Sequence, residues 1–262
     1  MKFFAAVAAA VSLVEAAIAA TTGPYEAYYT TSLTLRDHTI YRPRTLPNQA
    51  LPILVWGNGG CLKRGTMFEK ALTEIASHGY IVIANGGTGF SLGQTDSDML
   101  IESFNWIERN AQTGTYAGKI DPSKIVVAGQ SCGGLEAVEV SNDPRIIATG
   151  VFNSGLLNPT RDGAWLQRLT KPIFYFLGGP DDIAYPNGER DYTNLPSGLP
   201  AWKGNLNVGH EATWSEVNGG EFGNIAVKWL NWITKGDTAG RDYLMGGGAA
   251  AKGWSIVHKN LQ

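Results

Sequence analysis

Residues 129–133 read Gly-Gln-Ser-Cys-Gly, a G-x-S-x-G motif whose residue types suit nucleophilic chemistry. An apolar run over residues 124–128 precedes the motif, and residues 134–140 after it can form a helix. A strand, this motif and a helix together build a nucleophile elbow, a sharp turn that lifts the serine hydroxyl off the backbone. Glycine is needed on both sides because a side chain there would collide with the neighbouring strand or helix. Ser131 is therefore the predicted nucleophile.

A serine hydroxyl needs a base to take its proton, and the base needs an acid that orients its ring. Two histidines follow Ser131 in the sequence, His210 and His258. His210 lies in a predicted loop between the last strand and the last long helix, where a fold with a nucleophile elbow carries its base. His258 lies beyond that helix. His210 is therefore the predicted base.

The acid is expected after the predicted strand at 173–177, because the chain order around such an elbow is Ser, then Asp or Glu, then His. Two adjacent carboxylates compete for this role, Asp181 and Asp182. We favour Asp182 because residues 179–182 have the common G-x-x-D spacing. Asp181 would then cap the loop or face solvent, and Asp191 is a weaker third candidate.

Backbone amides must stabilise the negative oxygen that forms when a serine attacks a carbonyl group. The amide of Cys132, the residue after the nucleophile, is the first candidate donor. The second is expected from Asn58 or Gly59, which follow the predicted strand at 52–56 in a Gly-Asn-Gly-Gly loop. Small residues in this loop would let the substrate approach the amide closely.

Three residues beside these segments are candidates for binding the substrate. Trp214 lies just beyond the predicted base, and Asn153 and Leu156 lie on the loop after the predicted strand at 146–152. We expect these three side chains to line a pocket for the acyl group.

The elements that must position these residues alternate along the chain. We expect strands at residues 25–33, 39–42, 52–56, 80–84, 124–128, 146–152, 173–177 and 206–208, and helices at 67–77, 97–110, 134–140 and 222–234. Short apolar strands that alternate with helices indicate a mainly parallel sheet with helices on both faces. The predicted fold class is therefore α/β.

The chain has 262 residues and a formal net charge of −2 at pH 7. Residues 1–19 are expected to be a secretory signal peptide, with one lysine, an apolar stretch and a small-x-small cleavage site. Residues 20–262 then suit a single domain. The charge offers no basic face for nucleic acid, and the sequence shows no membrane anchor, metal-ligand spacing or cofactor motif.

With these motifs in place, the chain resembles secreted α/β-hydrolases related to the cutinase-like and polyester-hydrolase enzymes, with dienelactone hydrolases more distant. The resemblance covers about residues 39–246. Its matching pieces are residues 56–59, the elbow, and residues 182–184, 209–210, 229–230 and 235–238. The chain departs from the polyesterases at Cys132 and Gly134 in the elbow. It also has Asn58 where an aromatic residue is usual, which argues against an open aromatic clamp for polymer chains.

The resemblance implies hydrolysis of carboxylic esters without a cofactor, through Ser131, His210 and Asp182 and an acyl-enzyme intermediate. The expected substrate is a small-molecule or polymeric ester, and the expected protein is a secreted, extracellular monomer. Two alternatives remain open. One is a peptidase or acyltransferase with the same triad, and the other is a catalytically silent binding protein on a hydrolase scaffold.

The two cysteines of the chain, Cys61 and Cys132, each follow a segment that is expected to supply an oxyanion amide. On the fold that the resemblance implies, those segments lie side by side. A disulfide between Cys61 and Cys132 is therefore expected in an oxidising compartment. The alternative is a pair of buried free thiols that only pack together.

Overall fold

A computed structural model of the protein describes residues 21–89 and 91–261, so the predicted signal peptide at residues 1–19 lies outside the described residues. The strands are β1 (Ala27–Ser32), β2 (Leu35–Pro43), β3 (Leu51–Gly57), β4 (Ile81–Asn85), β5 (Ile120–Gln130), β6 (Ile146–Phe152), β7 (Ile173–Leu177), β8 (Ala201–Asn205) and β9 (Ser255–Lys259). The helices are α1 (Glu69–Ser77), α2 (Ser97–Asn110), α3 (Cys132–Val140), α4 (Pro159–Gln167), α5 (Tyr185–Asn194), α6 (Gly220–Lys235) and α7 (Thr238–Met245), and a short 3-10 helix, η1, spans Gly59–Cys61.

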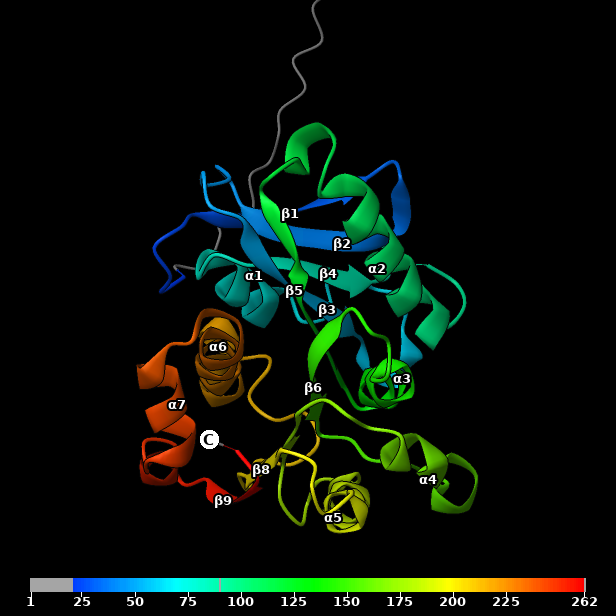
Figure 1. Ribbon diagram of the computed structural model, residues 1–262, viewed down its shortest axis with the longest axis vertical. Helices are drawn as coiled ribbons and strands as arrows, with labels where there is room; N and C mark the ends of the chain where they lie inside the picture. The colour runs from blue at the N-terminus through cyan, green and yellow to red at the C-terminus, as the bar shows by residue number, and fades with distance from the viewer. Residues whose placement is uncertain (1–20, 90, 262) are drawn as a thin grey trace, which may run out of the picture.

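All of these strands belong to one sheet with the order β1-β2-β4-β3-β5-β6-β7-β8-β9. The central strands from β4 to β8 in this order are parallel, whereas β1, β2 and β9 join antiparallel at the two edges. Helices α1, α6 and α7 cover one face, and α2, α3, α4 and α5 cover the other (Figure 1). The predicted α/β fold with a mainly parallel central sheet is confirmed.

The central strands are continuous apolar runs because both of their faces are covered by helices. Every residue of β3, β4 and β7 is buried. Successive side chains of a strand point to opposite faces. In β3, Leu54 and Trp56 accordingly join the core under α1 and α6, whereas Ile53 and Val55 join the core under α2 and α3.

The carboxyl ends of the parallel strands meet at one edge of the sheet, and the loops at this edge carry the predicted site. Ser131 follows β5, Asn153 follows β6, Asp182 follows β7 and His210 follows β8. The sheet therefore brings together Ser131 and His210, which are 79 positions apart in the sequence.

The last parallel strand differs from the sequence prediction. It was expected at residues 206–208, but β8 is Ala201–Asn205, and residues 206–208 form the bend that follows it. Lys203 and Gly204 interrupt the apolar pattern of β8, so its sequence is a poor indicator of a strand. Pairing with β7 on one side and β9 on the other overrides this weak local preference.

Helices α4, α5 and α7 are absent from the sequence prediction. Each contains glycine together with other residues of low helix propensity, which weakens its local helical signal. Two of them are stabilised by side-chain caps at their amino ends. Asn158 accepts the Arg161 amide at the start of α4, and Asp237 accepts the Ala239 amide at the start of α7.

Candidate active site

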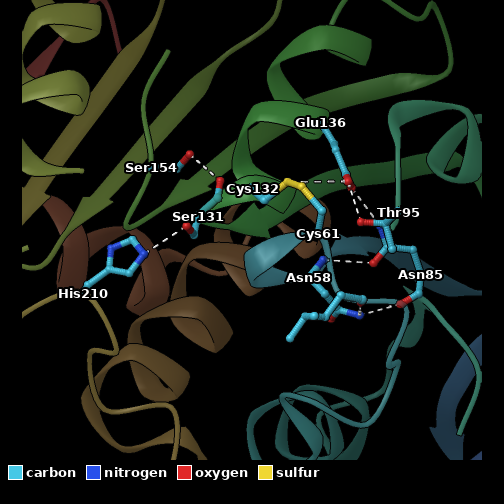
Figure 2. The surroundings of a disulfide bond; sticks show 10 residues. Asn58, Cys61, Asn85, Thr95, Ser131, Cys132, Glu136, Ser154 and His210 are labelled. Carbon is cyan, nitrogen blue, oxygen red and sulfur yellow. Dashed lines mark hydrogen bonds between the residues drawn. A yellow bond between two sulfur atoms is a disulfide. The ribbon is translucent and has the colours of Figure 1, made fainter. Parts of the chain in front are cut away.

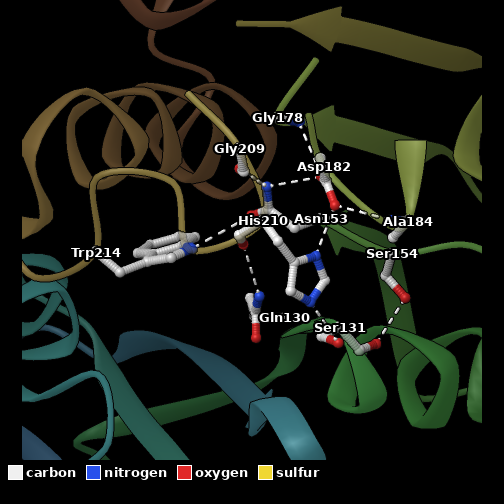
Figure 3. A network of polar contacts seen from close by, with 10 residues as sticks. All are labelled: Gln130, Ser131, Asn153, Ser154, Gly178, Asp182, Ala184, Gly209, His210 and Trp214. Atoms are coloured by element: carbon white, nitrogen blue, oxygen red, sulfur yellow. Dashed lines mark hydrogen bonds and ion pairs between the residues drawn. The ribbon is translucent and has the colours of Figure 1, made fainter. Parts of the chain in front are cut away.

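Ser131 occupies the turn between β5 and α3 with φ 52° and ψ −116°, a conformation that residues other than glycine rarely adopt. Its amide donates to the Phe152 carbonyl at 2.9 Å. Its carbonyl accepts from the Ser154 hydroxyl at 2.6 Å and from the Gly134 amide at 3.0 Å. Backbone strain of this kind typically costs about 1–3 kcal/mol and persists where surrounding contacts hold it. The turn points the Ser131 hydroxyl toward His210 (Figure 3).

Two glycines of the motif let the start of α3 lie directly against the ends of β3 and β5. A Cβ atom on Gly129 would lie 2.3 Å from the carbonyl carbon of Gly133. A Cβ atom on Gly133 would lie 2.0 Å from the carbonyl carbon of Gly57. The prediction that both flanking positions require glycine for steric reasons is confirmed.

His210 lies between the predicted nucleophile and the predicted acid (Figure 3). Its Nε2 is 2.9 Å from Ser131 Oγ, and its Nδ1 is 2.6 Å from Asp182 Oδ1. Gly209, with φ 78°, turns the chain into this position, and Gln130 Nε2 donates to the His210 carbonyl at 3.1 Å. An imidazole that donates from Nδ1 to a carboxylate presents an unprotonated Nε2 to the hydroxyl. The arrangement can therefore remove a proton from the serine.

Asp182 is 1% exposed, and its carboxylate accepts three further hydrogen bonds. The donors are Asn153 Nδ2 at 3.0 Å, the Gly178 amide at 3.1 Å and the Ala184 amide at 2.9 Å. These bonds offset the cost of burying a charge and fix the direction of the carboxylate. Asp181, the competing candidate, is exposed and forms no hydrogen bond or ion pair with His210 among the described residues.

Asp191, the third candidate acid, lies in α5. It takes no part in the hydrogen bonds that join Ser131, His210 and Asp182. Its carboxylate accepts the Leu156 amide at 2.5 Å and pairs with Arg190 at 3.3 Å. Burial raises the pKa of Asp191, and the Leu156 amide and Arg190 partly oppose this rise. Asp191 therefore anchors the loop after β6 to α5.

Of the two alternatives for the second oxyanion donor, Asn58 has a backbone amide that is already bonded inside the protein. The Asn58 amide donates to Asn85 Oδ1 at 2.9 Å, and the Asn58 side chain donates to the Arg64 carbonyl at 2.9 Å. The Asn58 carbonyl accepts from the Gly133 amide at 3.0 Å. In a trans peptide a carbonyl and the next N–H point in opposite directions, so the Gly59 N–H faces away from Gly133.

The amides of Gly59 and Cys132 have no hydrogen-bond partner within residues 21–89 and 91–261. The Ser131 carbonyl is bonded to Gly134 and Ser154, so the Cys132 N–H points in the opposite direction. Unpaired amides on these two segments can receive a negative oxygen. Gly59 and Cys132, two of the three predicted donors, are therefore the candidate oxyanion pair.

Asn153, Leu156 and Trp214 are buried and expose almost no surface to a substrate, which differs from the sequence prediction. Asn153 and Leu156 are fully buried, and Trp214 packs among the aromatic rings of the core. Asn153 Oδ1 accepts from Trp214 Nε1 at 3.4 Å, while Asn153 Nδ2 donates to Asp182. Trp214 thereby holds Asn153, and Asn153 holds the acid.

Cys61 and Cys132 form the predicted disulfide, with Cα atoms 5.3 Å apart (Figure 2). The bond joins η1, after β3, to the first residue of α3. It therefore links the two segments that carry the unpaired amides. Within the described part of the chain, one group of three potential metal ligands lies together, namely Cys61, Cys132 and Glu136, and both of its sulfur atoms belong to the disulfide.

Gln130 and Ser154 contact the site but are absent from the sequence prediction. Gln130 is 3% exposed and bonds to the His210 carbonyl, and a Cβ atom on Gly59 would lie 2.0 Å from Gln130 Oε1. Gln130 therefore touches both the loop that carries His210 and the segment from Asn58 to Cys61, which we call the oxyanion loop. Its place directly before Ser131 in the motif is a signal that could have identified it, whereas nothing in the sequence singles out Ser154.

Two observations concern the chain beyond this site. None of the helices that the structure describes is long and apolar enough to cross a membrane. A cavity lies beside α1 and α6, and its lining contains none of the predicted site residues.

Comparison with known proteins adds no identification. No model of a known protein family matches the sequence, and no curated protein matches it. The structure shows an α/β protein with a nine-stranded, mostly parallel mixed sheet.

Proposed function

We propose that this protein is a secreted serine esterase that hydrolyses carboxylic esters through an acyl-enzyme intermediate. One observation carries the proposal, the chain of hydrogen bonds from Ser131 Oγ through His210 to Asp182, with lengths of 2.9 Å and 2.6 Å. A buried acid, an oriented base and a serine on a strained turn are the parts that an activated nucleophile requires. The resemblance to cutinase-like and polyester-hydrolase enzymes supports the same activity.

In the first half of the reaction, His210 Nε2 takes the hydroxyl proton while Ser131 Oγ bonds to the ester carbonyl carbon. The carbonyl oxygen becomes negative and is stabilised by the amides of Gly59 and Cys132. His210 then gives the proton to the alcohol oxygen as the ester bond breaks. The carboxylate of Asp182 stabilises the imidazolium throughout this half of the reaction.

In the second half, a water molecule attacks the acyl group that is bonded to Ser131. His210 takes a proton from this water and returns it to Ser131 Oγ as the carboxylic acid leaves. Water is the only co-substrate, and the reaction releases the alcohol first and the carboxylic acid second.

Exposed apolar side chains on the same edge of the sheet favour an apolar substrate. Leu92, Leu157 and Ile183 are 84%, 72% and 79% exposed, and they follow β4, β6 and β7 respectively. Ile183 directly follows Asp182 in the chain. An exposed apolar side chain next to the acid in sequence can contact the apolar part of a bound ligand. We infer an ester with an apolar acyl or alcohol part, either small or polymeric.

The proposal of secretion rests on two features. The disulfide is typical of proteins in oxidising compartments, and residues 1–19 have the pattern of a signal peptide.

The direct test measures hydrolysis of p-nitrophenyl esters from acetate to palmitate by the purified protein. We expect turnover, with the highest kcat/KM for chains longer than acetate. Ser131→Ala should stay folded and lose about 10³-fold or more in turnover, and a serine-directed phosphonate should label Ser131 alone. Normal activity in Ser131→Ala, or labelling at another residue, would contradict the proposal.

The same protein preparation separates the alternatives. Cleavage of peptide substrates, or acyl transfer to an added alcohol in place of water, would favour the peptidase or acyltransferase. Inactivity toward all of these substrates, with no phosphonate labelling, would favour a silent binding protein.

A further inference from the structure

Glu136 is a buried carboxylate that the proposed mechanism does not use. It lies in α3, one turn after Cys132, and is 5% exposed. Its Oε2 accepts from Asn85 Nδ2 at 2.8 Å, and its Oε1 accepts from Thr95 Oγ1 at 2.6 Å. Burial raises the pKa of Glu136 to about 7, although these two bonds oppose the rise. Burying a carboxylate in the protein interior costs free energy of folding. The two residues that bond to Glu136 therefore indicate what it does.

The first partner, Asn85, connects Glu136 to the oxyanion loop (Figure 2). Asn85 ends β4, and its Oδ1 accepts the Asn58 amide at 2.9 Å while its Nδ2 donates to Glu136. The Asn85 amide group has nearly the same shape after a half-turn about its last bond. That rotation would point its NH2 group at the Asn58 N–H, so that two donors would face each other. In its ionised form Glu136 opposes that orientation, because a carboxylate accepts hydrogen bonds and cannot donate one. Glu136 thus sets which end of Asn85 faces Asn58.

The second partner, Thr95, connects Glu136 to the far end of the same loop. The Thr95 hydroxyl donates to Glu136, and the Thr95 amide donates to the Cys61 carbonyl at 2.8 Å. The disulfide leads from Cys61 back to α3, where Cys132 Sγ lies 4.0 Å from Glu136 Oε1. Glu136 therefore lies inside a closed set of contacts that joins the oxyanion loop to the first turn of α3.

We propose that Glu136 is a positioning residue that holds the Gly59 amide in place relative to the Cys132 amide, acting through Asn85 and Thr95. The inference rests on the proposed esterase function, because it concerns the oxyanion pair of that mechanism.

The peptide bond between Asn58 and Gly59 is the link between the carboxylate and the chemistry. The Gly59 N–H belongs to the same rigid peptide unit as the Asn58 carbonyl, so a shift of Asn58 moves the Gly59 donor with it. A preorganised donor stabilises the negative oxygen of the transition state more than the neutral carbonyl of the substrate. Loss of Glu136 should therefore lower kcat and leave KM nearly unchanged.

The test compares variants of the whole protein on one p-nitrophenyl ester. Glu136→Leu removes both acceptor oxygens and should lower kcat about 10- to 100-fold, with KM changed less than about twofold. Glu136→Gln keeps an acceptor for Asn85 and offers Thr95 a donor, so it should lose less than about threefold. Glu139 is exposed on the same helix, and Glu139→Gln is the matched control with unchanged kcat.

A second variant tests whether Glu136 acts through Asn85. Asn85→Leu should lower kcat by a similar factor, and adding Glu136→Leu should cause no further loss. The double variant places two apolar side chains together and leaves neither partner of that bond unpaired. Its melting temperature should therefore exceed that of either single variant while its kcat stays low. This combination separates positioning of the loop from general stability.

Normal kcat in Glu136→Leu would overturn the inference, as would losses that multiply in the double variant. Recovery of kcat together with the melting temperature would overturn it as well, because the effect would then be one of stability. If Ser131→Ala is inactive while Glu136→Leu is fully active, the esterase function stands and only this inference is lost. If Ser131→Ala is active, both are lost.

Discussion

At the scale of single residues, the orientation of His210 depends on a carboxylate that is held from several sides. Asp182 contacts the ring at 2.6 Å, and its other hydrogen bonds come from backbone amides and from Asn153. The acid therefore cannot rotate away from the base without breaking bonds in the interior. Within the described part of the chain nothing comparable holds Asp181, which faces solvent.

We therefore expect the two adjacent aspartates to respond very differently to the same substitution. Asp182→Asn keeps the shape but places an amide group beside His210, which favours the wrong tautomer and should lower kcat roughly 10³- to 10⁴-fold. Asp181→Asn should change kcat less than about twofold. The measurement is kcat for both variants on the same ester. Equal losses, or the reverse order, would show that the acid is misassigned.

The raised pKa of Glu136 gives a prediction for stability against pH. Burial is the main cause, and the nearby charges of Asp96 and Glu139 add to it. The folded protein binds this proton more tightly than the unfolded chain does, with a pKa of about 7 against 4.5. Ionisation therefore lowers the free energy of unfolding as the pH rises from about 4.5 to about 7.

Glu136→Gln removes this ionisation. Relative to the wild type, its free energy of unfolding should increase by up to roughly 3 kcal/mol between pH 4 and pH 8. Urea denaturation of both proteins at several pH values measures the difference. A difference that does not change with pH would mean that Glu136 keeps an ordinary pKa in the folded protein.

At the scale of elements, the start of α3 is packed backbone to backbone against β3. Gly133→Ala would bring a Cβ atom to 2.0 Å from the Gly57 carbonyl carbon and 2.6 Å from the Asn58 nitrogen. The helix must then move away from the oxyanion loop, at a cost of about 1–3 kcal/mol or more in stability. We expect a lower melting temperature and a large loss of kcat.

Gly163→Ala is the matched control for this prediction. Gly163 lies inside α4, and apart from its chain neighbours and the backbone of α4 itself, no atom of the described residues lies within 4 Å of the position that a Cβ atom would take. Alanine there should raise stability by roughly 0.5–1 kcal/mol through helix propensity and leave kcat unchanged. If Gly133→Ala behaves like Gly163→Ala, the close packing of α3 on β3 is wrong.

The elements that were predictable from the sequence are those with a strong local pattern. β3, β4 and β7 are unbroken apolar runs, and α2 and α6 have apolar residues at helical spacing. β8 was placed too late in the chain because its position depends on pairing with β7 and β9, which leaves no local pattern. Helices α4, α5 and α7 depend on caps and packing more than on propensity.

The candidate site divides in the same way. Ser131, His210 and Asp182 were predictable because motif, chain order and spacing point to them. The sequence could not show that Asn58 is not a free donor. Its amide bonds to Asn85, a residue 27 positions away that only the sheet brings near. Asn153 also has a contact that the sequence hides, since its side chain donates a hydrogen bond to Asp182, 29 positions further along the chain.

At the scale of the whole molecule, the disulfide closes a long loop and should matter for both stability and turnover. Cys61 and Cys132 are 71 positions apart, for which loop-closure entropy gives roughly 4 kcal/mol of stabilisation. The double substitution Cys61→Ser with Cys132→Ser should therefore lower the melting temperature. It should also lower kcat well below that temperature, because the two oxyanion segments lose their covalent link.

Intact-mass measurement after alkylation tests the bond itself. The wild-type protein should gain no alkyl groups before reduction and two after it. Alkylation of both cysteines without reductant would show free thiols, and the oxyanion loop would then be held by noncovalent contacts alone.

The strand order has a consequence for how the protein would acquire the proposed activity during folding. Parallel strands can pair only across long connections, and folds dominated by such contacts form slowly. The strand that presents Ser131 pairs with β3 and β6, whereas His210 follows β8, close to the edge of the sheet. A refolding chain can thus bury much of its core while its serine still lacks a base. Recovery of ester turnover should therefore lag behind the recovery of tryptophan fluorescence. By the same reasoning, a nascent chain carries an unreactive serine until its carboxyl-terminal strands are complete.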